Sequence, residues 1–226
     1  MPRIPVKIVT WDEIVEWSWQ LAKRIEEAGY VPDVIVGIAR GGLVPARLLC
    51  DFLNVENFLS IQSQHWTEAA KVSEKALIKF PYKVDLSGLR VLIVDDIVDT
   101  GDSMILAKEF VEKNWNPKEV KLAALQWIST VAKIKPDFYA IEVREWVWFQ
   151  YPWTRLEDVT QFIKRMLTEE CREKGAREWR FDQIIESFRE WYGVSVDERY
   201  YREALRLLIK KGVIRESDGV YVVTQC

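Results

Sequence analysis

One short segment constrains the fold more than any other part of this 226-residue chain. Residues 90–96 read Arg-Val-Leu-Ile-Val-Asp-Asp, an apolar run that ends in two adjacent carboxylates. A continuous run of this kind is typical of a strand in a parallel sheet whose two faces are both covered by helices. Comparable runs at residues 34–38, 57–61, 121–127 and 137–143 are predicted to be further strands of the same sheet.

Helical patterns separate these strands. A capping box formed by Thr10 and Glu13 opens a helix predicted over residues 11–28. Further helices are predicted over residues 43–53 and after the Thr-Gly-Asp turn, up to about Lys113. Strands that alternate with helices predict an α/β fold with a parallel sheet.

The pattern changes beyond residue 157. We expect one domain over residues 1–157 and a mostly helical extension over 158–226, which contains three helical patterns. The pair Asp218-Gly219 between two β-prone runs then predicts a hairpin. Three helices followed by a hairpin resemble a winged helix in outline.

Composition excludes several classes of protein. The chain is 49% hydrophobic and 30% charged, so it can bury a core and is not disordered. Its net charge of −3 argues against a nucleic-acid partner, and no apolar run is long enough to span a membrane. The three cysteines are odd in number and widely spaced, which argues against a disulfide framework or a zinc site. We therefore expect a cytoplasmic protein.

The strongest chemical signal follows the strand at residues 90–96. Asp95 and Asp96 come at its carboxyl end, where open α/β sheets place ligands. The turn over residues 99–103 then leads into a helix, and such a turn offers backbone N–H groups and a helix N-terminus to a phosphate. Acidic residues that only cap the helix are the structural alternative.

This string resembles the signature of type I phosphoribosyltransferases, which bind 5-phosphoribosyl diphosphate (PRPP). The resemblance implies that Asp95 and Asp96 bind the ribose hydroxyls. It also implies that the turn holds the 5′-phosphate, through these residues: Asp99, Thr100, Gly101, Asp102 and Ser103.

A second motif supports the same family. Residues 37–47, Gly-Ile-Ala-Arg-Gly-Gly-Leu-Val-Pro-Ala-Arg, resemble the family's pyrophosphate loop, with Ala39, Arg40 and Gly41 at its centre. The resemblance also implies a flexible lid that excludes water, at residues 62–82. His65 lies at the start of this segment, and we assign it no catalytic role.

The base site is inferred from the same resemblance. Asp99 stands where enzymes for 6-oxopurines carry an aspartate near N7, although a helix-capping role is equally compatible with its position. Residues 147–153 resemble the purine-binding stretch of xanthine-guanine-type members, which places Trp148 as the stacking aromatic and Phe149 at the pyrimidine edge; a core role for Trp148 is the alternative. Ile97 and Ile128 complete the predicted base site.

One departure from the family bears on specificity. Members that bind 6-oxopurines carry a lysine that meets O6, whereas Ile128 stands near that position here. An ammonium cannot accept a hydrogen bond from a 6-amino group, so its absence favours adenine. The sequence therefore predicts a purine phosphoribosyltransferase of the archaeal adenine type, with xanthine, guanine or hypoxanthine as the alternative bases.

The resemblance also implies a cofactor and an assembly. Mg²⁺ is expected to be held by PRPP, with Asp95 and Asp96 as possible protein ligands, and the chain is expected to form a homodimer. A PRPP-sensing regulator with a C-terminal winged helix is the rival hypothesis. Residues 155–226 hold as many basic as acidic residues, which argues against DNA binding.

Overall fold

The computed structural model describes residues 2–66 and 75–226. It divides into two compact units. Trp11–Trp146 form what we call the sheet unit, and Met1–Thr10 together with Val147–Cys226 form the helical unit. The expected boundary between residues 157 and 158 falls inside a helix, α4 (Arg155–Lys174), rather than between these units.

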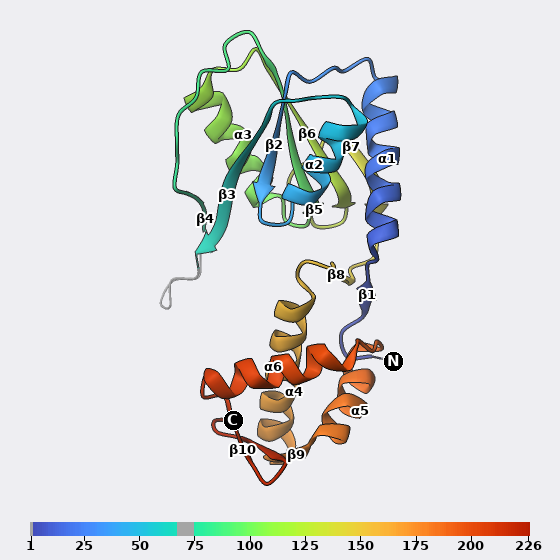
Figure 1. The fold of residues 1–226 in the computed structure, drawn as a ribbon, viewed down its shortest axis with the longest axis vertical. Helices are drawn as coiled ribbons and strands as arrows, with labels where there is room; N and C mark the ends of the chain where they lie inside the picture. The colour runs from blue at the N-terminus through green and yellow to red at the C-terminus, as the bar shows by residue number, and fades with distance from the viewer. Residues whose placement is uncertain (1, 67–74) are drawn as a thin grey trace. The chain divides into compact units, whose positions relative to one another are not determined.

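A six-stranded sheet forms the centre of the sheet unit (Figure 1), with the strand order β4-β3-β2-β5-β6-β7. Five of the strands are parallel, and β4 pairs antiparallel with β3 at one edge. The bounds of the strands are as follows: β2 Val34–Ala39, β3 Phe58–Trp66, β4 Lys75–Lys79, β5 Arg90–Val98, β6 Glu119–Ile128 and β7 Phe138–Val143.

Helices cover both faces of this sheet, which confirms the predicted α/β fold with a mostly parallel sheet. In Figure 1, α1 (Trp11–Glu27) and α2 (Leu43–Phe52) lie on one face, and α3 (Asp102–Trp115) lies on the other. Alternate residues of β2 and β5 are fully buried toward α3, among them Val36 and Ile93. Burial on both faces explains why these strands have continuous apolar sequences.

The segment predicted as a lid is partly regular. Residues 62–66 continue β3 and pair with β4, so the lack of periodicity at residues 62–87 concealed an antiparallel strand pair. Residues 67–74 lie outside the described part of the chain. The lid therefore remains a prediction.

Five elements follow α4 in the helical unit. A short first strand, β1 (Val6–Ile8), also belongs to this unit and pairs in parallel with β8 (Trp148–Gln150). Three antiparallel strands form a second sheet in the order β10-β11-β9. The bounds of the elements are as follows: β9 Glu178–Arg180, α5 Phe181–Tyr192, α6 Glu198–Lys210, β10 Ile214–Ser217 and β11 Val220–Val223.

The predicted hairpin is confirmed. Ser217 pairs with Val220, so Asp218 and Gly219 form a two-residue turn with positive φ angles of 52° and 76°. Both values suit the type I′ turn that the Asp-Gly pair favours.

Two further features concern the cysteines and the membrane. A disulfide joins Cys171 of α4 to Cys226, which the odd cysteine count and the separation of 55 residues did not indicate. Cys50 is a buried free thiol. Within residues 2–66 and 75–226, no helix combines the length and the apolar character needed to cross a bilayer.

Candidate functional site

Two buried carboxylates mark the carboxyl end of β5. Asp95 and Asp96 are each 9% exposed. Asp96 N–H donates to Asp95 Oδ1 (2.9 Å), and Ile97 N–H donates to Asp96 Oδ1 (3.0 Å). Burial and the neighbouring charge of Asp96 raise the pKa of Asp95 well above its usual range. The predicted pair is therefore held in one orientation by backbone donors and is costly to leave unliganded.

A tight turn connects β5 to α3. Gly101, at the N-cap of α3, has φ 88°, a left-handed conformation that glycine adopts without strain. The turn and the two carboxylates line one cavity of about 220 Å³, which extends from Asp95 to Met104. Partial burial raises the pKa of Asp99, which lies within this cavity. The structure thus brings the predicted ribose-binding and phosphate-binding residues together.

The loop after β2 lies directly against the acidic pair. A Cβ atom built on Gly41 would lie 2.2 Å from Asp96 Oδ2, and one on Gly42 would lie 2.4 Å from the Val94 carbonyl oxygen. The parallel pairing of β2 with β5 brings the two carboxyl ends to the same edge of the sheet. The Arg40 side chain is exposed at this edge, and the Ala39–Arg40 peptide bond is cis.

A third segment, which the sequence did not indicate, supports the turn. Lys133 N–H donates to the Thr100 carbonyl (2.8 Å), and Lys133 Nζ donates to both carboxylate oxygens of Asp102 (2.7 and 3.0 Å). A Cβ atom on Gly101 would lie 2.8 Å from Ile134 Cγ2. The β6–β7 connection therefore packs on the turn at three points, and no local sequence pattern predicts such a long-range contact.

The predicted base-binding residues belong to different units. Ile97 is half-buried and Ile128 is buried (2% exposed), both in the sheet unit. Trp148 and Phe149 lie on β8 of the helical unit. The Trp148 ring packs edge-to-face on Phe162 at 5.5 Å between centroids.

Asp158 fixes the orientation of Trp148. Its carboxylate accepts hydrogen bonds from Thr154 Oγ1 (2.7 Å) and from the Trp148 indole. Burial is the main reason why the pKa of Asp158 is raised to about 6. The base-stacking role of Trp148 stays a prediction, and so does that of Phe149.

Mg²⁺ suits the donors at the edge of the sheet, since it prefers carboxylate and other hard oxygen ligands. Asp95 and Asp96 offer such oxygens, and a diphosphate and water would complete the coordination. Across the described ranges, no cluster of three or more His, Cys, Asp or Glu side chains could hold an ion by itself.

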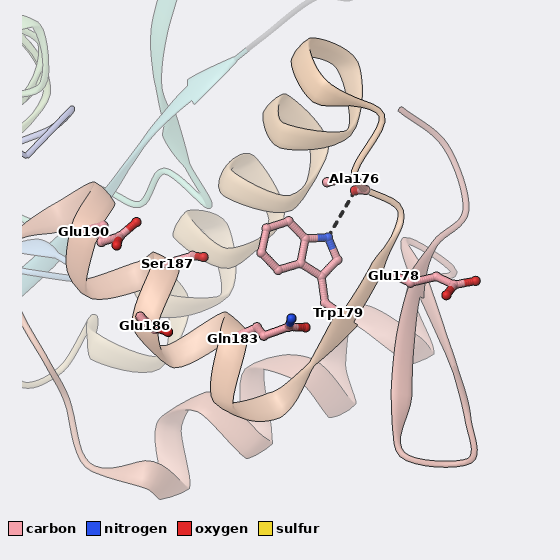
Figure 2. Close-up of a pocket in the computed structure, with 7 residues that line it drawn as sticks. All are labelled: Ala176, Glu178, Trp179, Gln183, Glu186, Ser187 and Glu190. Atoms are coloured by element: carbon pink, nitrogen blue, oxygen red, sulfur yellow. Dashed lines mark hydrogen bonds between the residues drawn. The ribbon is translucent and has the colours of Figure 1, made fainter.

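A second cavity, of about 350 Å³, lies in the helical unit (Figure 2). The Trp179 indole forms one wall and donates to the Ala176 carbonyl (3.1 Å). Three glutamates line this cavity, Glu178, Glu186 and Glu190. Their negative charges are unsuited to an anionic ligand such as a diphosphate.

Comparison with known proteins covers the first two-thirds of the chain. A family model described as "Phosphoribosyl transferase domain" matches residues 11–157. A xanthine-guanine phosphoribosyltransferase of Cereibacter sphaeroides (strain ATCC 17025 / ATH 2.4.3) is 31% identical over 153 residues, which are 64% of this chain and 84% of that protein. A second protein of that name, from Nitratidesulfovibrio vulgaris (strain DP4), is 30% identical over 147 residues, 64% of this chain and 82% of the relative.

A solved structure has a similar fold. The purine phosphoribosyltransferase from Pyrococcus horikoshii Ot3 is 33% identical, with a TM-score of 0.58. The match covers 66% of this chain and 93% of that one. Residues 158–226 lie beyond the span of the family model.

Proposed function

The chain belongs to the phosphoribosyltransferase family, and on that premise we propose that it transfers the 5-phosphoribosyl group of PRPP to a purine base and releases diphosphate. One observation carries this proposal. The Gly41 loop and the Asp96 carboxylate approach so closely that a single Cβ atom would not fit between them. A diphosphate on that loop and a ribose on that carboxylate would then share one reaction centre.

The reaction needs three parts of PRPP to be held in place. Asp95 and Asp96 accept hydrogen bonds from the ribose hydroxyls. The turn over residues 99–103 binds the 5′-phosphate with its N–H groups and the N-terminus of α3. Backbone N–H groups of Ala39 and Gly41, with the Arg40 guanidinium, bind the leaving diphosphate. Mg²⁺, when bound with PRPP, neutralises part of the charge of that diphosphate.

The proton of the base must also leave. The purine nitrogen forms a bond to C1′ while the bond from C1′ to the diphosphate oxygen breaks. Asp99 lines the same cavity, and its raised pKa suits a group that accepts a proton from the imidazole ring. Trp148 would stack on the purine and Phe149 would address its pyrimidine edge, with Ile97 and Ile128 as apolar contacts.

For the base, we favour a 6-oxopurine. Two relatives at 31% and 30% identity are named xanthine-guanine phosphoribosyltransferases, and this supports the alternative bases over the adenine preference. Adenine remains the second candidate because of Ile128, whose buried apolar side chain offers no hydrogen bond to O6. The nearest lysine along the chain, Lys133, donates a hydrogen bond to Asp102 of the turn over residues 99–103 instead.

The helical unit bears on the rival hypothesis, a PRPP-sensing regulator with a C-terminal winged helix. The order of elements supports a winged-helix-like extension: α4, β9, α5 and α6 are followed by the β10–β11 hairpin, which shares a sheet with β9. However, three arginines of α6 are paired with acidic neighbours: Arg199 with Asp197, Arg202 with Glu198 and Arg206 with Glu203. Paired cations do not form the basic face that DNA binding needs, so we favour the enzyme over the regulator. The resemblance to the family further implies a homodimer, and a cytoplasmic location is part of the same proposal.

Initial rates with Mg·PRPP and six separate bases test the proposal: xanthine, guanine, hypoxanthine, adenine, uracil and orotate. Turnover on the first three supports the 6-oxopurine assignment. Turnover on adenine alone supports the inference that Ile128, in place of a lysine, favours adenine. PRPP binding without turnover on any base would instead support the regulator.

Asp96→Asn tests the ribose assignment. We expect kcat/KM to fall by about a hundredfold, because a buried charged partner of the reacting ribose is lost. Asp51→Asn, at an exposed position of α2, is the matched control and should leave kcat/KM unchanged. A near-normal kcat/KM for Asp96→Asn would remove the assignment.

A further inference from the structure

The turn over residues 99–103, which is proposed to hold the 5′-phosphate, contains a carboxylate whose negative charge would repel that phosphate. Asp102 is the first residue of α3, and its side chain is 31% exposed. Thr100 Oγ1 donates to Asp102 Oδ2 (3.0 Å), so the carboxylate folds back over the turn. A 5′-phosphate carries about two negative charges at neutral pH, and a like charge this close weakens its binding unless a cation offsets it.

Lys133 supplies that cation from a distant part of the chain. Its ammonium contacts both oxygens of Asp102, at 2.7 and 3.0 Å, and its backbone N–H donates to the Thr100 carbonyl at 2.8 Å. The Cγ2 atom of the next residue, Ile134, lies 2.8 Å from where a Gly101 Cβ would be. Lys133 is thus fixed to the turn by its backbone and neutralises the turn's carboxylate with its side chain.

We propose that Lys133 is a positioning residue for the 5′-phosphate of PRPP: it offsets the charge of Asp102 and so allows the turn over residues 99–103 to accept a dianion. The inference rests on the proposed function, because it assumes that this turn holds the phosphate. It assigns a role to the β6–β7 connection, which the resemblance to the family did not single out.

The exposure of the pair shows where its effect should be measured. The Lys133 side chain is 61% exposed, and ion pairs this open to solvent contribute little to folding stability. A dianion bound beside the pair excludes water and meets the charge of Asp102 directly. The consequence of losing Lys133 should therefore be found in phosphate affinity rather than in thermal stability.

A neighbouring lysine provides a matched control. Lys135 lies two residues further on, and its ammonium sits over the Trp127 and Tyr139 rings at 5.2 and 5.5 Å from their centroids. Lys135→Gln removes the same charge from the same connection without touching Asp102. A general loss of positive charge would affect both variants, whereas the proposed role affects only Lys133→Gln.

The experiment measures the Kd of PRPP and of ribose 5-phosphate by calorimetry, with KM and kcat for PRPP on the base that the enzyme uses. For Lys133→Gln, we expect Kd and KM to rise about threefold to tenfold, the range for one partly exposed charge near a helix N-terminus. The value of kcat should change by less than twofold. Lys133→Arg should restore most of the affinity, and Lys135→Gln should match the wild type.

Asp102→Asn separates neutralisation from simple support of the turn. With the carboxylate removed, Lys133→Gln should weaken PRPP binding by less than about twofold, because there is no charge left to offset. An undiminished loss in this background would overturn the proposal, and so would a normal PRPP Kd for the single variant. Wild-type protein that binds neither PRPP nor ribose 5-phosphate would instead overturn the proposed function itself.

Discussion

Replacing Gly41 with alanine should disable the proposed reaction centre while leaving the fold nearly intact. The new Cβ atom would lie 2.2 Å from Asp96 Oδ2 and 2.5 Å from Oδ1 and Cγ. Contacts of a Cβ atom below 3.0 Å essentially do not occur, so the carboxylate and the loop must separate by at least 0.8 Å, the difference between 3.0 and 2.2 Å. We expect the side chain to yield more readily than the backbone. Displacements of about 1 Å at a reacting group cost roughly a hundredfold in rate.

The expected cost in stability is smaller. Moving the carboxylate breaks its hydrogen bond from Ile97 N–H, which contributes about 0.5–1.5 kcal/mol. For a chain of this size, that corresponds to a fall of about 1–6 °C in Tm. Gly41→Ala should therefore lose about a hundredfold in kcat/KM for PRPP and only a few degrees in Tm.

Two other glycines provide the comparison. A Cβ on Gly42 would meet backbone atoms, the Val94 carbonyl oxygen at 2.4 Å and the Ile38 carbonyl oxygen at 2.7 Å, which cannot rotate away. Gly42→Ala should thus cost more in Tm than Gly41→Ala, because such overpacking costs about 1–3 kcal/mol or more. Gly88 has φ 80° and open space around it, so Gly88→Ala tests backbone strain alone and should retain full activity.

The assay combines PRPP saturation kinetics with thermal unfolding followed by circular dichroism. A kcat/KM for Gly41→Ala within about threefold of the wild type would refute the claim that the loop after β2 constrains Asp96. In an Asp96→Ala background, Gly41→Ala should have no further effect, since the clash is gone. A further large loss in that background would show that the loop acts through another group.

Two remaining predictions concern the helical unit. Because burial raises the pKa of Asp158 from 3.8 to about 6, the folded state binds this proton more tightly than the unfolded chain does. The free energy of unfolding should therefore fall by up to about 3 kcal/mol as pH rises from about 4 to 6. Relative to wild type, Asp158→Asn should gain stability over that interval. Urea titrations at several pH values measure both free energies of unfolding, and a difference between variant and wild type that does not change with pH would show that the reasoning is wrong. Cys226→Ser opens the 55-residue loop to Cys171 and should cost about 2–4 kcal/mol, and a reductant should lower the Tm of the wild type but not that of the variant.

The sequence predicted the core of the sheet unit well, because its signals are local. A continuous apolar run identifies a buried strand, and residues 34–38 and 90–96 correspond to β2 and β5 almost to the residue. The turn that follows β5 and the Asp218-Gly219 hairpin were equally evident, since their conformations depend on glycine at particular positions. These short patterns were enough to place the acidic pair and the turn over residues 99–103 at one edge of the sheet.

Contacts between distant segments could not be predicted in the same way. The ion pair of Lys133 with Asp102 joins residues 31 apart, and the disulfide joins residues 55 apart. Neither has a periodicity that local sequence would reveal. The antiparallel strand β4 was missed for a related reason, since an edge strand lacks the continuous apolar pattern of a central one.

The geometry of the site depends most on the register between β2 and β5. Gly37 pairs with Val94, so the end of β2 runs beside Asp95 and Asp96, and the loop that follows must pass over them. A slip of one residue would turn the inward side chains of either strand to the opposite face of the sheet. It would bury apolar side chains against the wrong helices and, at the same time, carry Gly41 away from Asp96. The packing that fixes the register therefore also fixes the spacing between the loop and the acidic pair, while the backbone hydrogen bonds from Asp96 N–H and Ile97 N–H orient the two carboxylates.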